Sequence, residues 1–158
     1  MPDTLRVLVE IPKGSRNKYE YDEALGGIKL ARFLFSSVVY PADYGFIPGT
    51  AGEDGKPLKA MVLVGQPTFP GCVIEVRAIA ALRMVDDDVR DDKIVCVPLQ
   101  DPNWSDIEDL EHIPSQMRSE IEHFFSMYKQ PEGKTVSIEG FVDAPETERL
   151  IASSHPQG

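Results

Sequence analysis

The sequence lacks several features that would assign it to a membrane-bound or disulfide-rich class of protein. No apolar run is long enough to cross a bilayer, and the first ten residues contain no basic segment followed by a long hydrophobic stretch. We therefore expect a cytoplasmic protein with no membrane partner. The two cysteines, Cys72 and Cys96, lie in apolar, β-branched runs without a CxxC spacing. This setting favours buried free thiols over a disulfide or a zinc site.

Basic residues are also scarce, because 16 Lys and Arg stand against 26 Asp and Glu, for a formal net charge of −10. This balance argues against a nucleic acid or an anionic membrane as the main partner. The excess of acid has two explanations. It serves general solubility, or some carboxylates gather to hold divalent cations that bridge to an anionic substrate. The positions of the acids have to decide between the two.

Internal repeats and low-complexity linkers are absent from the sequence as well. A length of 158 residues is typical of one domain and allows most of the unfolded surface to be buried. With 42% hydrophobic and 27% charged residues, the composition is that of a folded globule. We therefore expect residues 1–158 to form a single domain with one core and one principal site.

Short apolar runs separated by Gly, Pro and Asp predict a sheet that is closed or nearly closed. The first three runs, with Gly26-Gly27 as the turn between the second and third, predict a meander. The fold class we expect is α+β dominated by β, with a small β-barrel. The predicted strands are Val7 to Ile11, Lys18 to Asp22, Ile28 to Phe33, Ala60 to Val64, Val73 to Met84, Ile94 to Val97 and Thr135 to Phe141.

Helical periodicity is confined to the second half of the chain. Between Pro114 and Lys129, apolar residues recur at helical spacing with polar residues between them, which predicts a helix packed against the barrel. We also expect a short helix from Ser105 to Leu110 and a helix from Pro145 to Ser153 that covers one end of the barrel. His155 to Gly158 is expected to fray.

The most informative stretch runs from Val39 to Pro48, where Tyr40 and Tyr44 flank a proline and an acid just before a glycine-rich loop. Taken alone, such a pair of tyrosines is more often the edge of a core. Two acidic turns follow, Glu53 to Lys59 and Met84 to Lys93. Four further segments accompany them: Val9 to Pro12, Asn17 to Glu20, Ala31 to Leu34 and His123 to Lys129.

In this order and spacing, these segments resemble the soluble (family I) inorganic pyrophosphatases from about Leu5 to the C-terminal helix. The resemblance implies a five-stranded barrel of the oligonucleotide-binding type with flanking helices, assembled as a homo-hexamer or another homo-oligomer. It implies Mg²⁺-dependent hydrolysis of diphosphate to two phosphates, with Mn²⁺ as an alternative ion. In the family, carboxylates hold the metal ions that acidify a water, while Lys, Arg and Tyr hold the phosphates in line.

The resemblance also implies roles for individual residues. Asp91 and Tyr44 match catalytic positions, Lys93 matches a basic residue close to the metals, and Glu20 matches an acid near them. The matches to phosphate-contacting positions are Lys18, Arg32, Tyr44, Tyr128, Lys129 and, across a one-residue gap, Lys134. The matches to metal-binding acids are Glu10, Asp54, Asp86 and Asp91.

The chain departs from the family at its signature loop, which here runs from Asp54 to Lys59. The family pattern has three acids in this loop, and two of those positions are Lys56 and Lys59 here, so the formal charge changes from three negative to one positive. An ammonium group about 4 Å from a divalent ion costs several kcal/mol even at an effective dielectric near 20. We therefore expect fewer metal sites and weakened hydrolysis.

Two functions remain open. The first is the hydrolase with a weakened active site. The second is a non-catalytic or altered-specificity paralogue that binds diphosphate or another small phosphorylated molecule, with Lys56 and Lys59 neutralising phosphate oxygens in place of Mg²⁺. A nucleic-acid binder built on the same type of barrel conflicts with the net acidity.

Overall fold

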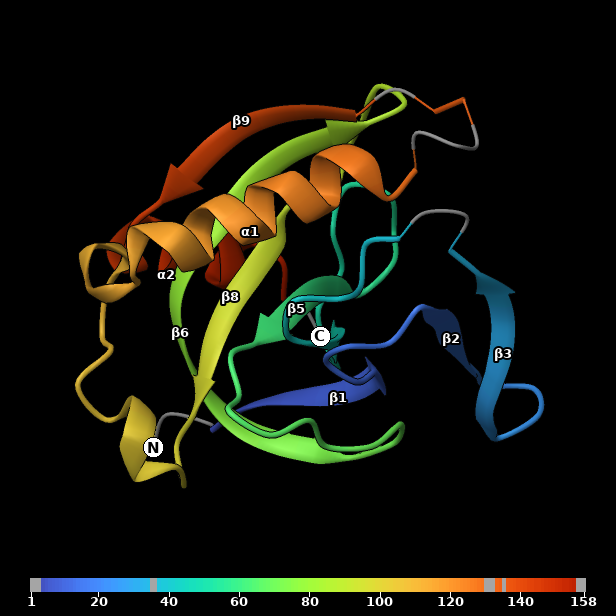
Figure 1. Cartoon of the computed structure of the whole chain (residues 1–158), viewed down its shortest axis with the longest axis horizontal. Coiled ribbons are helices and arrows are strands. Elements are labelled where there is room, and N and C mark those ends of the chain that lie inside the picture. The colour runs from blue at the N-terminus through green and yellow to red at the C-terminus, as the bar shows by residue number, and fades with distance from the viewer. Residues whose placement is uncertain (1–3, 35–36, 130–132, 135, 156–158) are drawn as a thin grey trace.

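The computed structural model describes residues 4–34, 37–129, 133–134 and 136–155. Within these ranges, five strands close into a barrel in which each strand pairs with the next and the last pairs with the first (Figure 1). One pair is parallel and the others are antiparallel. This confirms the predicted five-stranded barrel of the oligonucleotide-binding type. In ring order the strands are β1 (Leu5–Ile11), β4 (Asp43–Ile47), β5 (Leu58–Val62), β8 (Lys93–Pro98) and β6 (Val73–Asp86).

β6 is longer than the barrel and carries further elements. Its far end pairs with β7 (Val89–Arg90) and with β9 (Val136–Val142). The helix α1 (Ser115–Met127) lies over the sheet and buries Phe124 and Phe125 in the same cluster as residues of β6 and β8 (Figure 1). The helix α2 (Ala144–Ser153) packs against β6, and its N-terminus is capped by the Asp143 side chain. The flanking helices are therefore confirmed.

β2 (Asn17–Asp22) and β3 (Gly27–Phe33) form a separate two-stranded sheet that projects from the barrel (Figure 1). The predicted meander is therefore wrong, because β1 pairs with β4 and β6. β2 and β3 bury no residue completely, so they do not supply a wall of the barrel. The turn between them covers residues 23–26, so Gly26 lies in it with a φ of 70°, whereas Gly27, predicted as a turn residue, is already in β3.

The predicted helix from Ser105 to Leu110 is wrong as well. A 3-10 turn, η1 (Pro102–Trp104), precedes this range, and a second, η2 (Leu110–His112), begins at its last residue. Asp101 and Asp109 bind backbone N–H groups one or two residues ahead, which favours short capped turns over a continuous helix. In the C-terminal stretch expected to fray, residues 156–158 lie outside the described residues, as does Thr135 at the start of the last predicted strand.

The predicted free thiols are confirmed, with Cys96 buried and Cys72 partly buried. Burial raises the pKa of the Cys96 thiol, because a thiolate is poorly solvated inside the barrel. In the described part of the chain, no helix has the length and apolar character needed to span a membrane.

Candidate active site

Most of the predicted site residues meet in one cleft of about 550 Å³. Its walls come from β1, β2, the signature loop, the turn after β6 and the C-terminal end of α1. Segments far apart in the sequence therefore converge on one space, as the family resemblance implies. The predicted residues that line the cleft are Glu10, Lys18, Glu20, Tyr44, Asp54, Lys56, Lys59, Asp86, Asp91, Lys93, Tyr128 and Lys129.

Two predicted phosphate-contacting residues are not among those that line the cleft. Arg32 lies on β3 at the position paired with Lys18 on β2, and its charge contributes to the lowered pKa of Lys18. It is therefore a close neighbour of the cleft. Lys134 is exposed and is not among the residues that line the cleft. The role of Lys134 stays a prediction.

Glu10 reaches the cleft through an irregularity in β1. The register between β1 and β4 shifts between Val9 and Ile11, which leaves Glu10 as the extra residue of a β-bulge. Bulges of this kind redirect a side chain and are common beside active sites. The buried Glu10 carboxylate accepts a hydrogen bond of 2.8 Å from the backbone N–H of Tyr21. Its other oxygen lies 3.6 Å from Nζ of Lys59.

Lys93 lies buried at the floor of the cleft. Its ammonium donates hydrogen bonds of 2.9 Å to Oη of Tyr44 and to Oδ2 of Asp91. Burial alone would lower the pKa of Lys93, but the Tyr128 and Tyr44 phenols and the Asp91 carboxylate outweigh it and hold that pKa well above the usual value. Lys93 is therefore a permanent cation beneath Tyr44 and Asp91.

Asp91 and Tyr44 respond to Lys93 in different ways. Burial alone would raise the pKa of Asp91, yet the ammonium groups of Lys93, Lys129 and Lys59 hold it below the usual value, so Asp91 is ionised near neutral pH. Burial raises the pKa of Tyr44 well above its usual value despite the nearby Lys93. Tyr44 therefore enters the site as a neutral phenol that accepts from Lys93 and keeps its own O–H as a donor.

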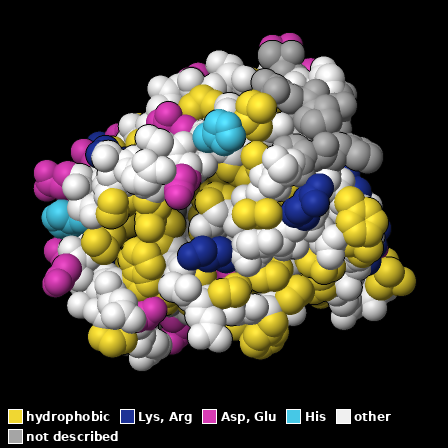
Figure 2. Space-filling view, in the orientation of Figure 1, with side chains coloured by type: hydrophobic (Ala, Val, Ile, Leu, Met, Phe, Trp, Pro, Cys, Tyr) yellow, Lys and Arg dark blue, Asp and Glu magenta, His cyan; other side chains and the backbone are white. Residues whose placement is uncertain are grey.

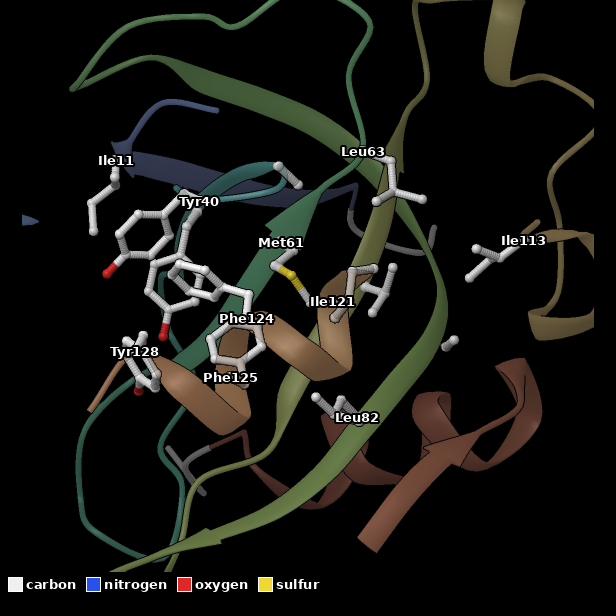
Figure 3. Packing of buried hydrophobic residues seen from close by; sticks show 14 of the residues in the cluster. Ile11, Tyr40, Met61, Leu63, Leu82, Ile113, Ile121, Phe124, Phe125 and Tyr128 are labelled. Atoms are coloured by element: carbon white, nitrogen blue, oxygen red, sulfur yellow. The ribbon is translucent and has the colours of Figure 1, made fainter. Parts of the chain in front are cut away.

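An aromatic layer forms the boundary between the cleft and the core. The Tyr40 ring lies 4.5 Å from Phe124 and 5.4 Å from Tyr44 between centroids. Figure 3 shows the phenol oxygens of Tyr40 and Tyr128 at the same edge of the core, on the side away from Leu63 and Ile113.

Tyr40 is a site residue to which the sequence analysis gave no role of its own. Its side chain is buried and lines the cleft, yet its Oη has no hydrogen-bond partner within the described residues. Burial raises its pKa, so the phenol stays neutral and keeps its proton. A buried hydroxyl without a partner is costly, which indicates a donor held ready for a ligand. Its four-residue spacing from Tyr44 is the one signal in the sequence.

The lowered pKa of Lys18 shows that the cleft is positively charged around this side chain. Its pKa is lowered from 10.5 to about 8, first by burial and then by the charges of Arg32, Lys129, Lys93 and Lys59. In Figure 2 the larger Lys and Arg groups lie toward the centre and right, the side from which β2 and β3 project, and Asp and Glu side chains are most numerous on the left. The positive potential at Lys18 favours an anionic ligand.

The predicted metal-binding acids are present, but most of them already have a lysine partner. Lys129 donates to Oδ2 of Asp86, Lys93 to Asp91, and Lys59 lies near Glu10. Asp54 is exposed, and its Oδ1 accepts the backbone N–H of Lys56. Across the described residues, no group of three or more His, Cys, Asp or Glu side chains is arranged as a metal cluster.

One oxygen nevertheless fits a metal ligand. Oδ1 of Asp86 is buried, and the described residues offer it no hydrogen-bond partner. Asp91 and Asp54 line the same cleft and add carboxylate oxygens, which are the donors that Mg²⁺ prefers. The donor set therefore fits Mg²⁺ in kind.

A barrel cleft with ammonium groups, an unpartnered phenol and a carboxylate oxygen left for a cation is typical of proteins that bind an oxygen-rich anion, such as a phosphoryl compound, together with divalent ions. The sequence model of the inorganic pyrophosphatase family matches residues 7–157, and the chain belongs to this family.

Related proteins agree with this assignment. An inorganic pyrophosphatase from Methanosarcina acetivorans is 58% identical over 135 residues, which cover 85% of this chain and 80% of that protein. One from Streptomyces coelicolor is 50% identical over 150 residues, with 94% and 92% covered. The crystal structure of the inorganic pyrophosphatase from Thermus thermophilus matches with a TM-score of 0.92 at 40% identity, covering 97% of this chain and 90% of that one.

Proposed function

We propose that this chain binds diphosphate in the cleft and hydrolyses it to two phosphates in a Mg²⁺-dependent reaction that Lys56 and Lys59 weaken. Mn²⁺ is the alternative ion. Family membership supports the reaction class. The single observation that carries the proposal is the convergence of the predicted cations, phenols and carboxylates on one cleft.

The cations and phenols of the cleft account for capture of the substrate. Lys18 and Lys129 are the ammonium groups along its walls, with Arg32 beside Lys18. An anion bound there offsets the repulsion that lowers the pKa of Lys18, so that binding at pH 8 draws a proton onto this lysine. Tyr40 and Tyr44 have O–H groups available to donate to phosphate oxygens.

Asp86 and Asp91 would hold the divalent ion, with Asp54 and Glu10 as further carboxylates of the same cleft. When bound, Mg²⁺ supplies Lewis-acid charge and acidifies a water. Lys93 keeps Asp91 ionised and orients it by binding Oδ2 alone. Asp91 therefore has its second oxygen for the metal or for a proton of the attacking water.

The weakening follows from the position of Lys59. Its ammonium lies 3.6 Å from the buried Glu10 carboxylate, so Glu10 is already neutralised by a cation that generates no hydroxide. A second divalent ion near Glu10 would have to displace Lys59 or tolerate its charge. Lys56 is exposed at the tip of the loop and adds positive charge without a fixed partner in the described structure. We therefore propose fewer metal sites than the family pattern has.

A phosphate-release assay with diphosphate and Mg²⁺ tests this proposal. We expect slow release from the unmodified chain and at least a tenfold faster release from the variant that combines Lys56→Asp with Lys59→Asp. Lys29→Asp is the control for a single such replacement, because it makes half the charge change, two units against four, on β3 outside the cleft. If the unmodified chain matches the Streptomyces coelicolor relative measured alongside it, the weakening is refuted.

The Lys59 to Glu10 contact also supports the second candidate, a binding paralogue without turnover. Calorimetric titration with diphosphate separates the two. Binding in EDTA, combined with no phosphate release under Mg²⁺ or Mn²⁺, would favour the paralogue. Release that requires the metal favours the hydrolase.

We further propose that residues 1–158 are a single domain, that the protein is cytoplasmic, and that it assembles as a homo-hexamer or another homo-oligomer. The match of the family model to nearly the whole chain supports the first point. Light scattering after size-exclusion chromatography tests the assembly, and a monomer at micromolar concentration would refute it.

A further inference from the structure

The turn between β6 and β7 carries a dense run of carboxylates. Five of the seven residues from Asp86 to Asp92 are aspartates, so they repel one another. Asp87 and Asp88 adopt φ values of 53° and 68°, a left-handed turn conformation that is uncommon outside glycine but that aspartate tolerates better than most residues. Two of the predicted metal ligands, Asp86 and Asp91, belong to this segment of mutually repelling charges. Other contacts have to hold it in place.

Asp92 supplies the first of these contacts. Its side chain is largely buried, and Oδ1 accepts hydrogen bonds of 3.0 Å from the backbone N–H of Met84 and from Arg90. Oδ2 forms an ion pair of 2.9 Å with Nε of Arg83, without hydrogen-bond geometry at that nitrogen. Met84 in turn accepts the backbone N–H of Asp91. The Asp92 carboxylate therefore ties the returning strand to β6 directly beside Asp91.

Arg90 extends these contacts to two other segments. Its terminal nitrogens bind Glu139 on β9 at 3.0 and 3.2 Å, and its Nε lies 3.7 Å from Glu53, the residue before the signature loop. Glu139 is the extra residue of a β-bulge, next to Gly140 with a φ of 111°. The bulge aims Glu139 at the guanidinium, and the hydrogen bonds between the two groups raise the pKa of Arg90 and lower that of Glu139.

We propose that Arg90 and Asp92 are positioning residues that fix Asp86 and Asp91 relative to the signature loop and thereby set the affinity of the cleft for divalent cations. This inference rests on the proposed function. Neither residue lines the cleft. Both line a second cavity of about 540 Å³ that shares Asp54, Lys56, Lys59 and Asp91 with the cleft. They act on the carboxylates from behind and contact no substrate.

The test measures Mn²⁺ and diphosphate binding separately, by calorimetry on the full chain. Arg90→Leu and Asp92→Asn are expected to raise the Kd for Mn²⁺ about tenfold or more, as changes behind metal ligands commonly do. The Kd for diphosphate in EDTA should stay within about twofold, since Lys18, Lys129 and the phenols are untouched. Arg90→Lys should recover only part of the Mn²⁺ affinity, because an ammonium cannot bind Glu139 through two nitrogens.

Arg6→Leu is the control, since it breaks an exposed ion pair of 3.7 Å with Glu75 on the barrel wall. Mn²⁺ affinity that stays unchanged in both Arg90→Leu and Asp92→Asn would overturn the inference. So would equal losses of Mn²⁺ and diphosphate affinity, or an unmodified chain that takes up no Mn²⁺. A failure of the unmodified chain to bind diphosphate, with or without Mn²⁺, would instead refute the proposed function.

Discussion

Replacing Lys59 with aspartate probes the feature that separates this cleft from the family pattern. Nζ of Lys59 lies 3.6 Å from the buried Glu10 carboxylate. Two unit charges at this distance attract by about 4 to 5 kcal/mol at an effective dielectric near 20. Solvent at the partly exposed lysine reduces this to about 2 kcal/mol. Lys59→Asp replaces the attraction with repulsion, so the free energy of unfolding in EDTA should fall by about 3 kcal/mol.

A loss of about 3 kcal/mol corresponds to a Tm about 6 to 12 °C lower for a chain of this size. Adding Mg²⁺ should reverse the loss in this variant, because Glu10 and the new carboxylate then form an oxygen site. Ligand at 100 times its Kd stabilises the native state by about 2.7 kcal/mol. Thermal unfolding in EDTA and in saturating Mg²⁺ measures both effects.

Lys56→Asp is the matched comparison, since it changes the same charge in the same loop at an exposed side chain. It leaves the backbone bond from Lys56 to Asp54 intact. We expect its free energy of unfolding to change by less than about 1 kcal/mol in EDTA. Equal responses of the two variants to EDTA and Mg²⁺ would refute the reasoning, because the contact with Glu10 would then carry no weight.

Two further predictions concern Lys18 and Gly45. The folded-state pKa of Lys18, about 8, lies below its usual 10.5, so the native state binds fewer protons than the unfolded state and its stability rises between pH 8 and 10.5. Lys18→Gln should raise the free energy of unfolding at pH 7 by about 1 kcal/mol after screening, and it should flatten the rise in stability between pH 8 and 10.5. Urea unfolding at two pH values measures both effects. The variant should also bind diphosphate more weakly, which calorimetry measures. A Cβ at Gly45 would lie 1.9 Å from the Leu8 carbonyl oxygen, so Gly45→Ala should lower the free energy of unfolding by more than about 3 kcal/mol. Gly27→Ala is the control, because its Cβ meets nothing within 4 Å, and it should lower the free energy of unfolding by less than about 1 kcal/mol in the same urea assay.

The sequence predicts four of the five barrel strands, misses β4 (Asp43–Ile47), and predicts the strand partners poorly. β8 is a nearly continuous apolar run and β6 is mainly apolar despite Glu75, Arg77 and Arg83, and the predicted ranges agree with the observed ones to within two residues. The meander fails because periodicity shows which residues are buried and not which strand lies alongside. The pairs that close the ring, β1 with β6 and β5 with β8, join strands far apart in the sequence. No local signal encodes such pairings.

The family resemblance predicted most of the residues that line the cleft. It did not predict how they are placed, because β-bulges break the regular alternation of side chains along the strands. Glu10 enters the cleft, and Glu139 meets Arg90, because each is the extra residue of a bulge. Tyr40 was missed because its distinguishing feature, a buried Oη without a hydrogen-bond partner among the described residues, is visible only in the structure. Lys134 is exposed and is not among the residues that line the cleft, so its role stays a prediction from the sequence match.

Similarity to relatives in the backbone and in most side chains does not determine how fast this chain hydrolyses diphosphate, because, under our proposal, that rate depends on Lys56 and Lys59. Lys56 is exposed and Lys59 is a partly exposed residue near the start of β5, so neither replacement puts a charge into the barrel core. A fold comparison is therefore insensitive to both. Yet the attraction between Lys59 and Glu10, about 2 kcal/mol after screening by solvent, acts at the position where the family pattern places metal ions. In the proposed function, diphosphate is held by Lys18, Lys129 and the phenols, which match the family pattern, whereas activation of water needs carboxylates that Lys56 and Lys59 have replaced. Binding and hydrolysis therefore need not persist together.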